Sequence, residues 1–374
     1  MQDPDKGFAY MIAADTKPSL LLDGATPHLI DEWQMAPVLW DAVRFAVDQR
    51  QVMGQFILTG SAVPKDNVTM HTGTGRISRL TMRTMSLFES QESNGSVLLR
   101  DLFAGTFPVM EPASLGIEQI AFAICRGGWP ASVKMKGQDA LELSRDYVDA
   151  IIHQDISRVD GVEKNPKRVQ LLLRSLARNV ATMATNVTIL KDMETEEGSM
   201  TAPTLDSYMN ALRRIFVVED QPAWSPSMRS KTAIRTMSKH HFTDPSIATA
   251  VLRTSPKGLL EDFNTLGFLF ESLCTRDMRI YAQANDGEIL HFRNKNGLEA
   301  DMIVALNDGR WAAVEVKLGN KQIEEAAEHL KQLAQNVDVE KMGQPSFLMV
   351  LTGGEFAYQR KDGVLVVPIS CMKD

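Results

Sequence analysis

Short apolar runs and amphipathic stretches alternate over residues 1–115. Four of the apolar runs have the length of buried strands, and they lie at 19–23, 28–32, 55–61 and 80–87. Between the second and the third run, residues 38–50 place Leu39, Val43 and Val47 at helical spacing. This alternation of strand and helix predicts an α/β fold with a parallel sheet.

Residues 116–257 have a different pattern, in which amphipathic helices dominate. Residues 167–182 have one apolar side, and two shorter helices are expected at 187–193 and 204–215. An apolar run typical of a strand, 215–219, follows the last of these helices. Helix, turn, helix and strand in this order are typical of a winged helix.

Residues 258–374 again predict an α/β fold. Two amphipathic helices are expected, at 259–282 and 321–335. The expected strands are 288–293, 299–306, 311–317, 346–352 and 363–368. The pair Asp308-Gly309 favours a hairpin turn between the second and the third of these strands.

Composition excludes several classes of protein. The chain has 374 residues, of which 44% are hydrophobic and 23% are charged, as in an ordinary globular protein. Its net charge of −7 excludes a uniformly basic nucleic-acid binder but leaves a local basic face open. Cys125, Cys274 and Cys371 are scattered, which argues against a disulfide framework or a zinc site and predicts a cytoplasmic protein. No apolar run is long enough for a membrane span, and the first residues do not resemble a signal peptide.

The sharpest motif of the first region is an apolar strand that ends in two adjacent acids, Asp31 and Glu32. In a Walker B motif the first acid holds Mg²⁺, and the second polarises the water that attacks the γ-phosphate of ATP. A strand end followed by a helix cap would also place two acids here. A second strand ends in Thr59, where a γ-phosphate sensor would lie, and Gly75-Arg76 follows it.

These segments resemble the AAA+ ATPase domain of a large group of bacterial and archaeal ATPases. The resemblance rests on residues 29–34, 57–62, 75–76 and 85–89. It implies that Asp31 and Glu32 are the Walker B acids and that Thr59 is the sensor. It also implies that Arg76 faces the phosphates, with Arg79 and Arg83 as close competitors. ATP and Mg²⁺ would be the cofactors, bound through Asp31, Thr59 and Arg76.

The same resemblance implies the strand order 5-1-4-3-2 in the sheet. Strands three, four and five would be residues 29–31, 56–59 and 80–85. However, no G-x-x-x-x-G-K-[ST] motif occurs in the sequence. That loop supplies the backbone N–H groups and the Lys that hold the phosphates. We interpret the chain as an N-terminally truncated, incomplete AAA+ domain, and we expect it to be ATPase-deficient.

The C-terminal region carries Asp301 on one predicted strand and Glu315-Val316-Lys317 on the next, fourteen residues later. This is the spacing of the PD-(D/E)XK nuclease core, and the ATPases named above share it. Glu315 and Lys317 lie on one face of their strand because strands have a period of two. Asp301, Glu315 and Glu271, which lies on the preceding helix, would hold Mg²⁺ or Mn²⁺, and Lys317 would be catalytic. Two alternatives remain open: a surface cluster of ion pairs, or a nuclease-like fold that cleaves nothing.

The middle region is locally basic. Residues 158–239 contain 13 Lys or Arg against 9 Asp or Glu. Arg229, Lys231, Arg235 and Lys239 follow the expected strand, where a wing would meet the phosphates of DNA. A basic face that only packs between domains is the alternative. We further expect His240-His241 to lie in a loop, and the five Trp residues to be too dispersed to form a stacking platform.

Together these patterns predict three parts. An incomplete AAA+ domain covers 1–115, a helical and winged-helix region covers 116–257, and a PD-(D/E)XK-like α/β domain covers 258–374. The expected function is that of an AAA+ family ATP-binding protein with a nuclease-like domain, associated with nucleic acid. The rival is a nucleotide-dependent switch or scaffold that binds protein partners. Neither involves a membrane, and the sequence leaves the oligomeric state open.

Overall fold

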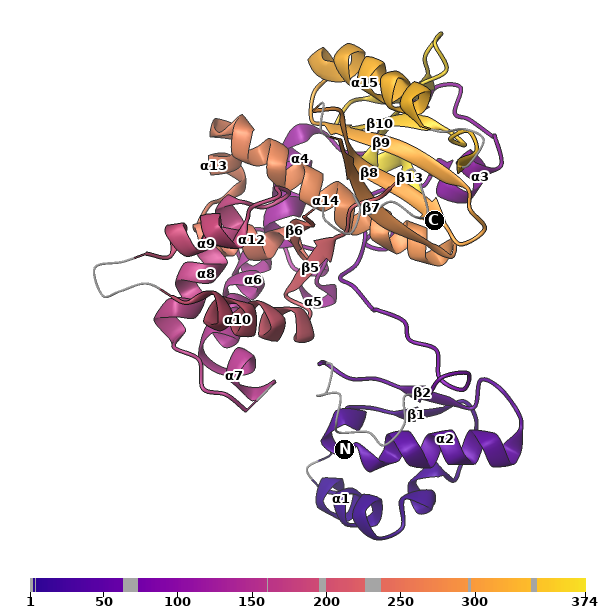
Figure 1. Ribbon diagram of the computed structural model, residues 1–374, viewed down its shortest axis with the longest axis vertical. Helices are drawn as coiled ribbons and strands as arrows, with labels where there is room; N and C mark the ends of the chain where they lie inside the picture. The colour runs from indigo at the N-terminus through magenta and orange to yellow at the C-terminus, as the bar shows by residue number, and fades with distance from the viewer. Residues whose placement is uncertain are drawn as a thin grey trace. The chain divides into compact units, whose positions relative to one another are not determined.

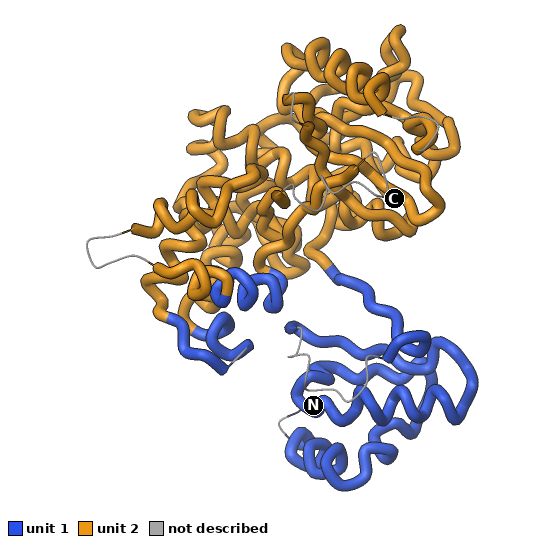
Figure 2. The backbone as a smooth tube through the Cα atoms, in the orientation of Figure 1, with its two compact units in different colours: residues 1–82, 154–164, 207–216 blue, residues 83–153, 165–206, 217–374 orange. Residues whose placement is uncertain are grey.

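The computed structural model describes residues 3, 5–62, 73–159, 161–194, 200–225, 237–294, 297–337 and 342–374. The chain forms two compact units (Figure 2). Unit 1 consists of residues 1–82, 154–164 and 207–216, and unit 2 of residues 83–153, 165–206 and 217–374. Most of the regions predicted as 116–257 and 258–374 thus lie in one unit. In the part of the chain that is described, no helix is both long and apolar enough to cross a membrane.

The N-terminal part of unit 1 is built on two short parallel strands. Its elements are α1 (Gly7–Thr16), η1 (Pro18–Leu22), β1 (His28–Ile30), η2 (Trp33–Met35), α2 (Val38–Arg50) and β2 (Phe56–Leu58) (Figure 1). The register pairs Leu29 with Ile57, which confirms that these two strands are parallel neighbours. The apolar sides of the helices and of β1 form one core, which consists of Ala14, Leu22, Ile30, Ala36, Leu39 and Val43.

The prediction of a strand at 80–87 is wrong, because these residues form no strand. The backbone of this segment has other partners. The N–H of Met85 donates to the carbonyl of Gly128 at 2.7 Å, and the N–H of Leu87 donates to the carboxylate of Asp277 at 2.9 Å. Leu87 is fully buried. The later part of this segment, from Arg83, is therefore an anchored loop of unit 2, whereas Leu80 and Met82 before it are exposed.

Helices dominate the middle of the chain. They are α4 (Ile117–Arg126), α5 (Pro130–Val133), α6 (Asp139–Ala150), η3 (Ile151–Asp155), α7 (Ile156–Arg158), α8 (Pro166–Arg178), α9 (Asn186–Asp192), α10 (Ala202–Arg214), α12 (Pro245–Leu252) and α13 (Pro256–Glu261). The start of α8 shows why the sequence folds this way. Asn165 caps it by accepting hydrogen bonds from the N–H groups of Lys167 and Arg168, and Pro166 occupies the first helical position.

A two-stranded antiparallel hairpin follows α10. Its strands are β5 (Val218–Gln221) and β6 (Lys239–Phe242), and Thr182 forms an isolated bridge to His240. The predicted order of helices and strand is confirmed. The prediction that His240 and His241 lie in a loop is wrong, since both are on β6 and both are buried. Arg229, Lys231 and Arg235 lie outside the described residues.

The large sheet of unit 2 is mixed. Its described strands run in the order β4-β11-β12-β10-β9-β8-β7. They are β4 (Glu111–Pro112), β7 (Gly287–Arg293), β8 (Glu299–Leu306), β9 (Trp311–Lys317), β10 (Leu348–Thr352), β11 (Phe356–Gln359) and β12 (Leu365–Pro368). β7, β8 and β9 pair antiparallel, whereas β10 is parallel to β9 and to β12. The five strands predicted in this region are confirmed, with small shifts at their ends.

Helices α14 (Phe263–Ala284) and α15 (Ile323–Asn336) lie on different sides of this sheet (Figure 1). The short elements α3 (Leu99–Phe103), β3 (Val97–Leu98), η4 (Asn320–Gln322), η5 (Ile369–Cys371) and β13 (Met372–Lys373) complete the unit. The apolar side of α15 packs on the sheet through Ile323, Ala326, Ala327, Leu330 and Leu333, in a core that includes Trp311 and Val350. Leu330 and Leu333 are fully buried, as the spacing of an amphipathic helix requires.

The segment after β5 joins the middle of the chain to the large sheet. The N–H of Trp224 donates to the carbonyl of His291 on β7 at 2.6 Å, and the N–H of His291 donates to the carbonyl of Pro222 at 2.9 Å. The ring of Trp224 stacks on that of Trp311 with centroids 4.8 Å apart. These two tryptophans stack on each other in the interior of unit 2, where they are 8% and 1% exposed. Trp224, which follows the hairpin strand β5, thus belongs to the hydrophobic core of the sheet.

Candidate carboxylate–lysine site

The ends of β1 and β2 in unit 1 bring Asp31 and Thr59 together, as the sequence predicts. Thr59 Oγ1 donates a hydrogen bond to Asp31 Oδ1 at 2.5 Å. The backbone fixes this approach, because the N–H of Thr59 donates to the carbonyl of Ile30 at 3.0 Å. Parallel strands end at the same edge of a sheet, and polar groups that follow them gather there.

Glu32 lies next to this pair but turns away through a left-handed backbone conformation, with φ of 54°. Its Oε2 accepts hydrogen bonds from Gln34 Nε2 and from Ser61 Oγ, the latter at 3.2 Å. The structure therefore places Asp31, Glu32 and Thr59 at one edge of the small sheet. Glu32 is held there by side chains that follow both strands.

Arg76 is not brought to this edge. Its Nε pairs with Asp48 Oδ1 at 2.8 Å, near the end of α2. Asp48 lies ten residues along a helix that starts just after the acids, which amounts to about 15 Å of helix. Of the two competitors, Arg79 lies over the ring of Trp40 at 5.5 Å, and Arg83 pairs with Glu219 in unit 2 at 2.5 Å. The phosphate-facing role implied for Arg76 thus gains no support from its contacts.

The second set of predicted residues meets in unit 2. Asp301 lies near the start of β8, and Glu315 and Lys317 lie at the end of the neighbouring strand β9. Asp301 Oδ2 accepts a hydrogen bond from the N–H of Val316 at 2.8 Å, which ties the two strand ends together. Lys317 Nζ is 2.8 Å from Glu315 Oε2 and 3.9 Å from Asp301 Oδ2.

Glu271 on α14 completes the set through a residue that the sequence did not identify. Lys239 Nζ, from β6, is 2.7 Å from Glu271 Oε1 and 3.2 Å from Asp301 Oδ1. The expectation that Lys239 meets phosphates on an exposed wing is wrong, because its exposed fraction is 9%. We call these five residues, Glu271, Lys239, Asp301, Lys317 and Glu315, the carboxylate–lysine cluster.

Burial sets the electrostatics of the cluster. Burial, reinforced by the neighbouring Asp301 carboxylate, raises the pKa of Glu315 to about 8 and that of Glu271 to about 7. Burial would also raise the pKa of Asp301, but Lys239 and Lys317 outweigh it and hold that pKa below its usual value. These side chains are 2–25% exposed. The alternative of a surface cluster of ion pairs is therefore excluded.

A cavity of about 520 Å³ opens beside Glu315 and Lys317. One polar side of α15 lines it, with Glu325, His329, Gln332 and Asn336 at the three- and four-residue spacing of a helix face, together with the N-cap residue Gln322. Glu315 is 2% exposed, and its Oε1 has no hydrogen-bond partner. A buried carboxylate oxygen without a partner is costly unless a ligand satisfies it.

The spacing of the cluster implies a site for a divalent ion. As the side chains stand, no group of three or more His, Cys, Asp or Glu among the described residues is arranged to hold a metal ion. The chemistry of the donors fits, because carboxylate oxygens are the ligands that Mg²⁺ and Mn²⁺ prefer, and Glu315 Oε1 is free. Lys239 occupies the position between two of the carboxylates.

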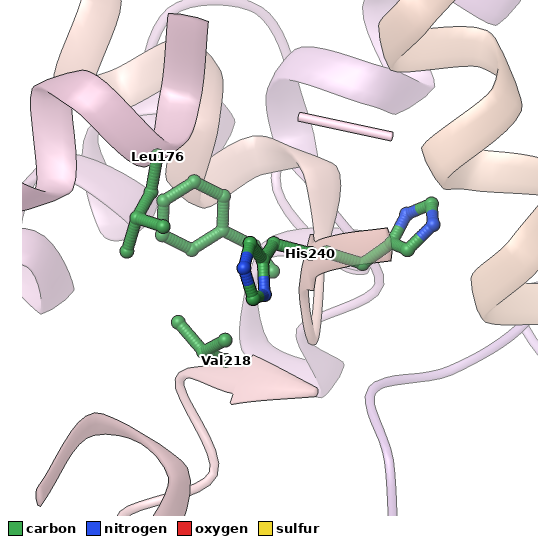
Figure 3. Close-up of a pocket in the computed structure, with 5 residues that line it drawn as sticks. Leu176, Val218 and His240 are labelled. Atoms are coloured by element: carbon green, nitrogen blue, oxygen red, sulfur yellow. The ribbon is translucent and has the colours of Figure 1, made fainter. Parts of the chain in front are cut away.

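A second hollow lies away from the cluster, where β5 and β6 face α8. Leu176, Val218 and His240 line it together with His241 and Phe242 (Figure 3). It is too small to hold a water molecule. His240 Nδ1 is 2.7 Å from Asp220 Oδ1, and His241 Nε2 is 3.1 Å from Gln221 Oε1. These histidines hold the hairpin together and form no binding site.

Comparisons with known proteins find two family models that match the middle and C-terminal regions of the chain. Residues 117–258 match a domain of unknown function, DUF8612, and residues 266–372 match a second domain of unknown function, DUF4143. No curated protein and no solved structure matches the chain. The C-terminal match is consistent with a domain family that is associated with AAA ATPases.

Proposed function

We propose that the chain is an AAA+-type ATP-binding protein whose C-terminal region contains a PD-(D/E)XK-like, metal-dependent nuclease centre. The observation that carries the proposal is the convergence of Asp301, Glu315 and Lys317 at the ends of two neighbouring strands, beside a cavity. The placement of Glu271 on the helix that precedes these strands also supports the proposal, because related nucleases carry a further acid there.

Each residue of the cluster has a role in this proposal. Asp301 and Glu315, with Glu271 behind them, would hold Mg²⁺ or Mn²⁺. The bound ion would supply an activated water and neutralise charge on the phosphate. Lys317 is close enough to Glu315 to orient the attacking water and to stabilise negative charge as it develops. The amide and imidazole groups along α15 offer hydrogen bonds to a nucleic acid in the cavity.

Cleavage of single-stranded, linear and branched DNA with millimolar Mg²⁺ or Mn²⁺ tests the proposal. Glu315→Gln is expected to lower the rate by about 100-fold or more, as the loss of a charge at a catalytic centre does. Glu325→Gln is the matched control, because Glu325 lines the same cavity outside the cluster, and it should cleave at close to the wild-type rate. Equal rates for the wild type and Glu315→Gln would contradict the proposal.

The N-terminal edge makes a separate prediction. Asp31 and Thr59 can contact Mg²⁺, but no glycine-rich loop with a Lys cradles the phosphates. This chain is therefore expected to bind ATP only weakly and to hydrolyse it at the background rate, which calorimetry and phosphate release would measure. A micromolar dissociation constant, with turnover that Glu32→Gln abolishes, would contradict this expectation.

The rival function, a scaffold with a non-catalytic nuclease-like fold, is favoured by one observation. Lys239 already neutralises Glu271 and Asp301, and Trp224 locks the same hairpin into the core of the sheet. Such a scaffold would bind a protein partner through a rigid unit 2. It predicts no metal-dependent cleavage by the wild type or by any variant of the cluster.

A further inference from the structure

The contacts of Lys239 differ from those of an ordinary buried lysine, because it lies between two acids of a predicted metal centre. Its ammonium contacts Glu271 on α14 at 2.7 Å and Asp301 on β8 at 3.2 Å, and the lysine itself comes from β6. The lysine is only 9% exposed, and both carboxylates lie within ion-pair distance of its ammonium. A permanent cation is thus held in place among the carboxylates.

Four of the six carboxylate oxygens of the cluster already have a partner. Asp301 uses Oδ1 for Lys239, and its Oδ2 accepts from the N–H of Val316 and faces Lys317. Glu271 uses Oε1 for Lys239, and Glu315 uses Oε2 for Lys317. Among the described residues of the cluster, Glu315 Oε1 is the oxygen identified as buried and without a partner. A divalent ion that enters therefore meets an Asp301 carboxylate with both oxygens engaged, and a fixed positive charge beside it.

The sum of the charges in the cluster also indicates that Lys239 opposes the binding of a divalent ion. Three carboxylates and two ammonium groups sum to a formal charge of −1 when all are ionised. Without the ammonium of Lys239, the sum is −2, which one divalent cation neutralises. Two cations at this spacing repel each other strongly in a poorly solvated site. The lysine and the metal ion are therefore competitors for the same carboxylates.

We propose that Lys239 is a built-in counter-cation that restricts access of a divalent ion to Asp301 and Glu271, so that the hairpin of the middle region controls the metal centre of the C-terminal region. This inference rests on the proposed metal centre and adds its regulation. Anything that withdraws the side chain of Lys239 would open the centre. The side chain of Lys239 would thus connect the region that matches DUF8612 with the metal centre in the region that matches DUF4143.

The test is Mn²⁺ binding, measured by calorimetry on the full chain. Lys239→Met keeps the length and apolar stem of the side chain but removes the charge, and it is expected to bind Mn²⁺ at least about tenfold more tightly than the wild type. Lys239→Arg keeps the charge and should bind as weakly as the wild type. Adding Asp301→Asn to Lys239→Met should abolish the gain.

Thermal melts address the folding of Lys239→Met, because it leaves two buried carboxylates facing each other. The variant should melt below the wild type without metal and recover with Mn²⁺, since a ligand that binds the folded state stabilises it. Equally tight binding by the wild type and Lys239→Met would overturn the role of Lys239 but leave the metal centre. No Mn²⁺ binding by either protein would overturn both proposals.

Discussion

Asp244→Ala is expected to lower the free energy of unfolding by about 3–5 kcal/mol, because it removes the acceptor from a fully buried network. One carboxylate oxygen, Asp244 Oδ2, accepts hydrogen bonds from Thr84 Oγ1 at 2.7 Å, from the N–H of Gly128 at 2.9 Å and from Arg276 Nη1 at 3.0 Å. Arg276 is also buried, and without Asp244 it keeps only Asp277 as an ionic partner. Chemical denaturation would measure the loss.

Asp362→Ala is the matched control. Asp362 also binds an arginine and a lysine, Arg360 and Lys331, but at the surface, where such pairs contribute less than about 1 kcal/mol. The loss of unfolding free energy for Asp244→Asn should lie between those for Asp244→Ala and Asp362→Ala, since Asn keeps one acceptor oxygen without the charge. A loss for Asp244→Ala no larger than that for Asp362→Ala would show that the network does not hold residues 84–128 to the rest of unit 2.

Trp224→Ala should lower the free energy of unfolding by a similar amount, about 3–5 kcal/mol, because it opens a large cavity in the core. Trp224 is 8% exposed, stacks on Trp311 and meets the ring of Phe292 edge-on at 5.9 Å. Since Trp224 follows β5 and Trp311 lies on β9, the loss measures how firmly the middle region is built into the sheet. Unfolding should be followed by circular dichroism and by fluorescence.

The conservative variant separates packing from backbone effects. Trp224→Phe keeps an aromatic ring in the core and should lose less than half as much stability as Trp224→Ala. Both variants should unfold unit 2 in one transition, as a shared core requires. If Trp224→Ala left the C-terminal sheet as stable as before, the middle and C-terminal regions would be independent domains.

The elements whose residues are close in sequence could be predicted well. The period-two strands that carry Asp301, Glu315 and Lys317 lie as expected, because a hairpin fixes their register locally. Asp31 and Thr59 meet because parallel strands end at one edge. The strand at 80–87 could not be distinguished from an anchored loop, since its apolar residues bind partners as distant as Asp277.

Contacts between distant residues could not be predicted. Lys239 precedes Asp301 by 62 positions. In the sequence it is one of several basic residues in a basic segment, and nothing there connects it with Asp301. Its burial depends on the pairing of β5 with the edge of the large sheet, where the side-chain amide of Gln221 donates to the carbonyls of Leu290 and Asp301. The sequence around it, Lys239-His240-His241-Phe242, gives no apolar pattern that would mark the lysine as buried. Trp224 and Trp311 likewise meet only in the folded core.

The most direct test of the metal centre is anomalous scattering from Mn²⁺ in crystals of the Lys239→Met variant. We predict one peak within direct coordination distance of both Asp301 and Glu315, and its absence when Asp301→Asn is added. A map with no peak at the carboxylate–lysine cluster, or with a peak that Asp301→Asn leaves unchanged, would contradict the assignment of a metal centre to this site.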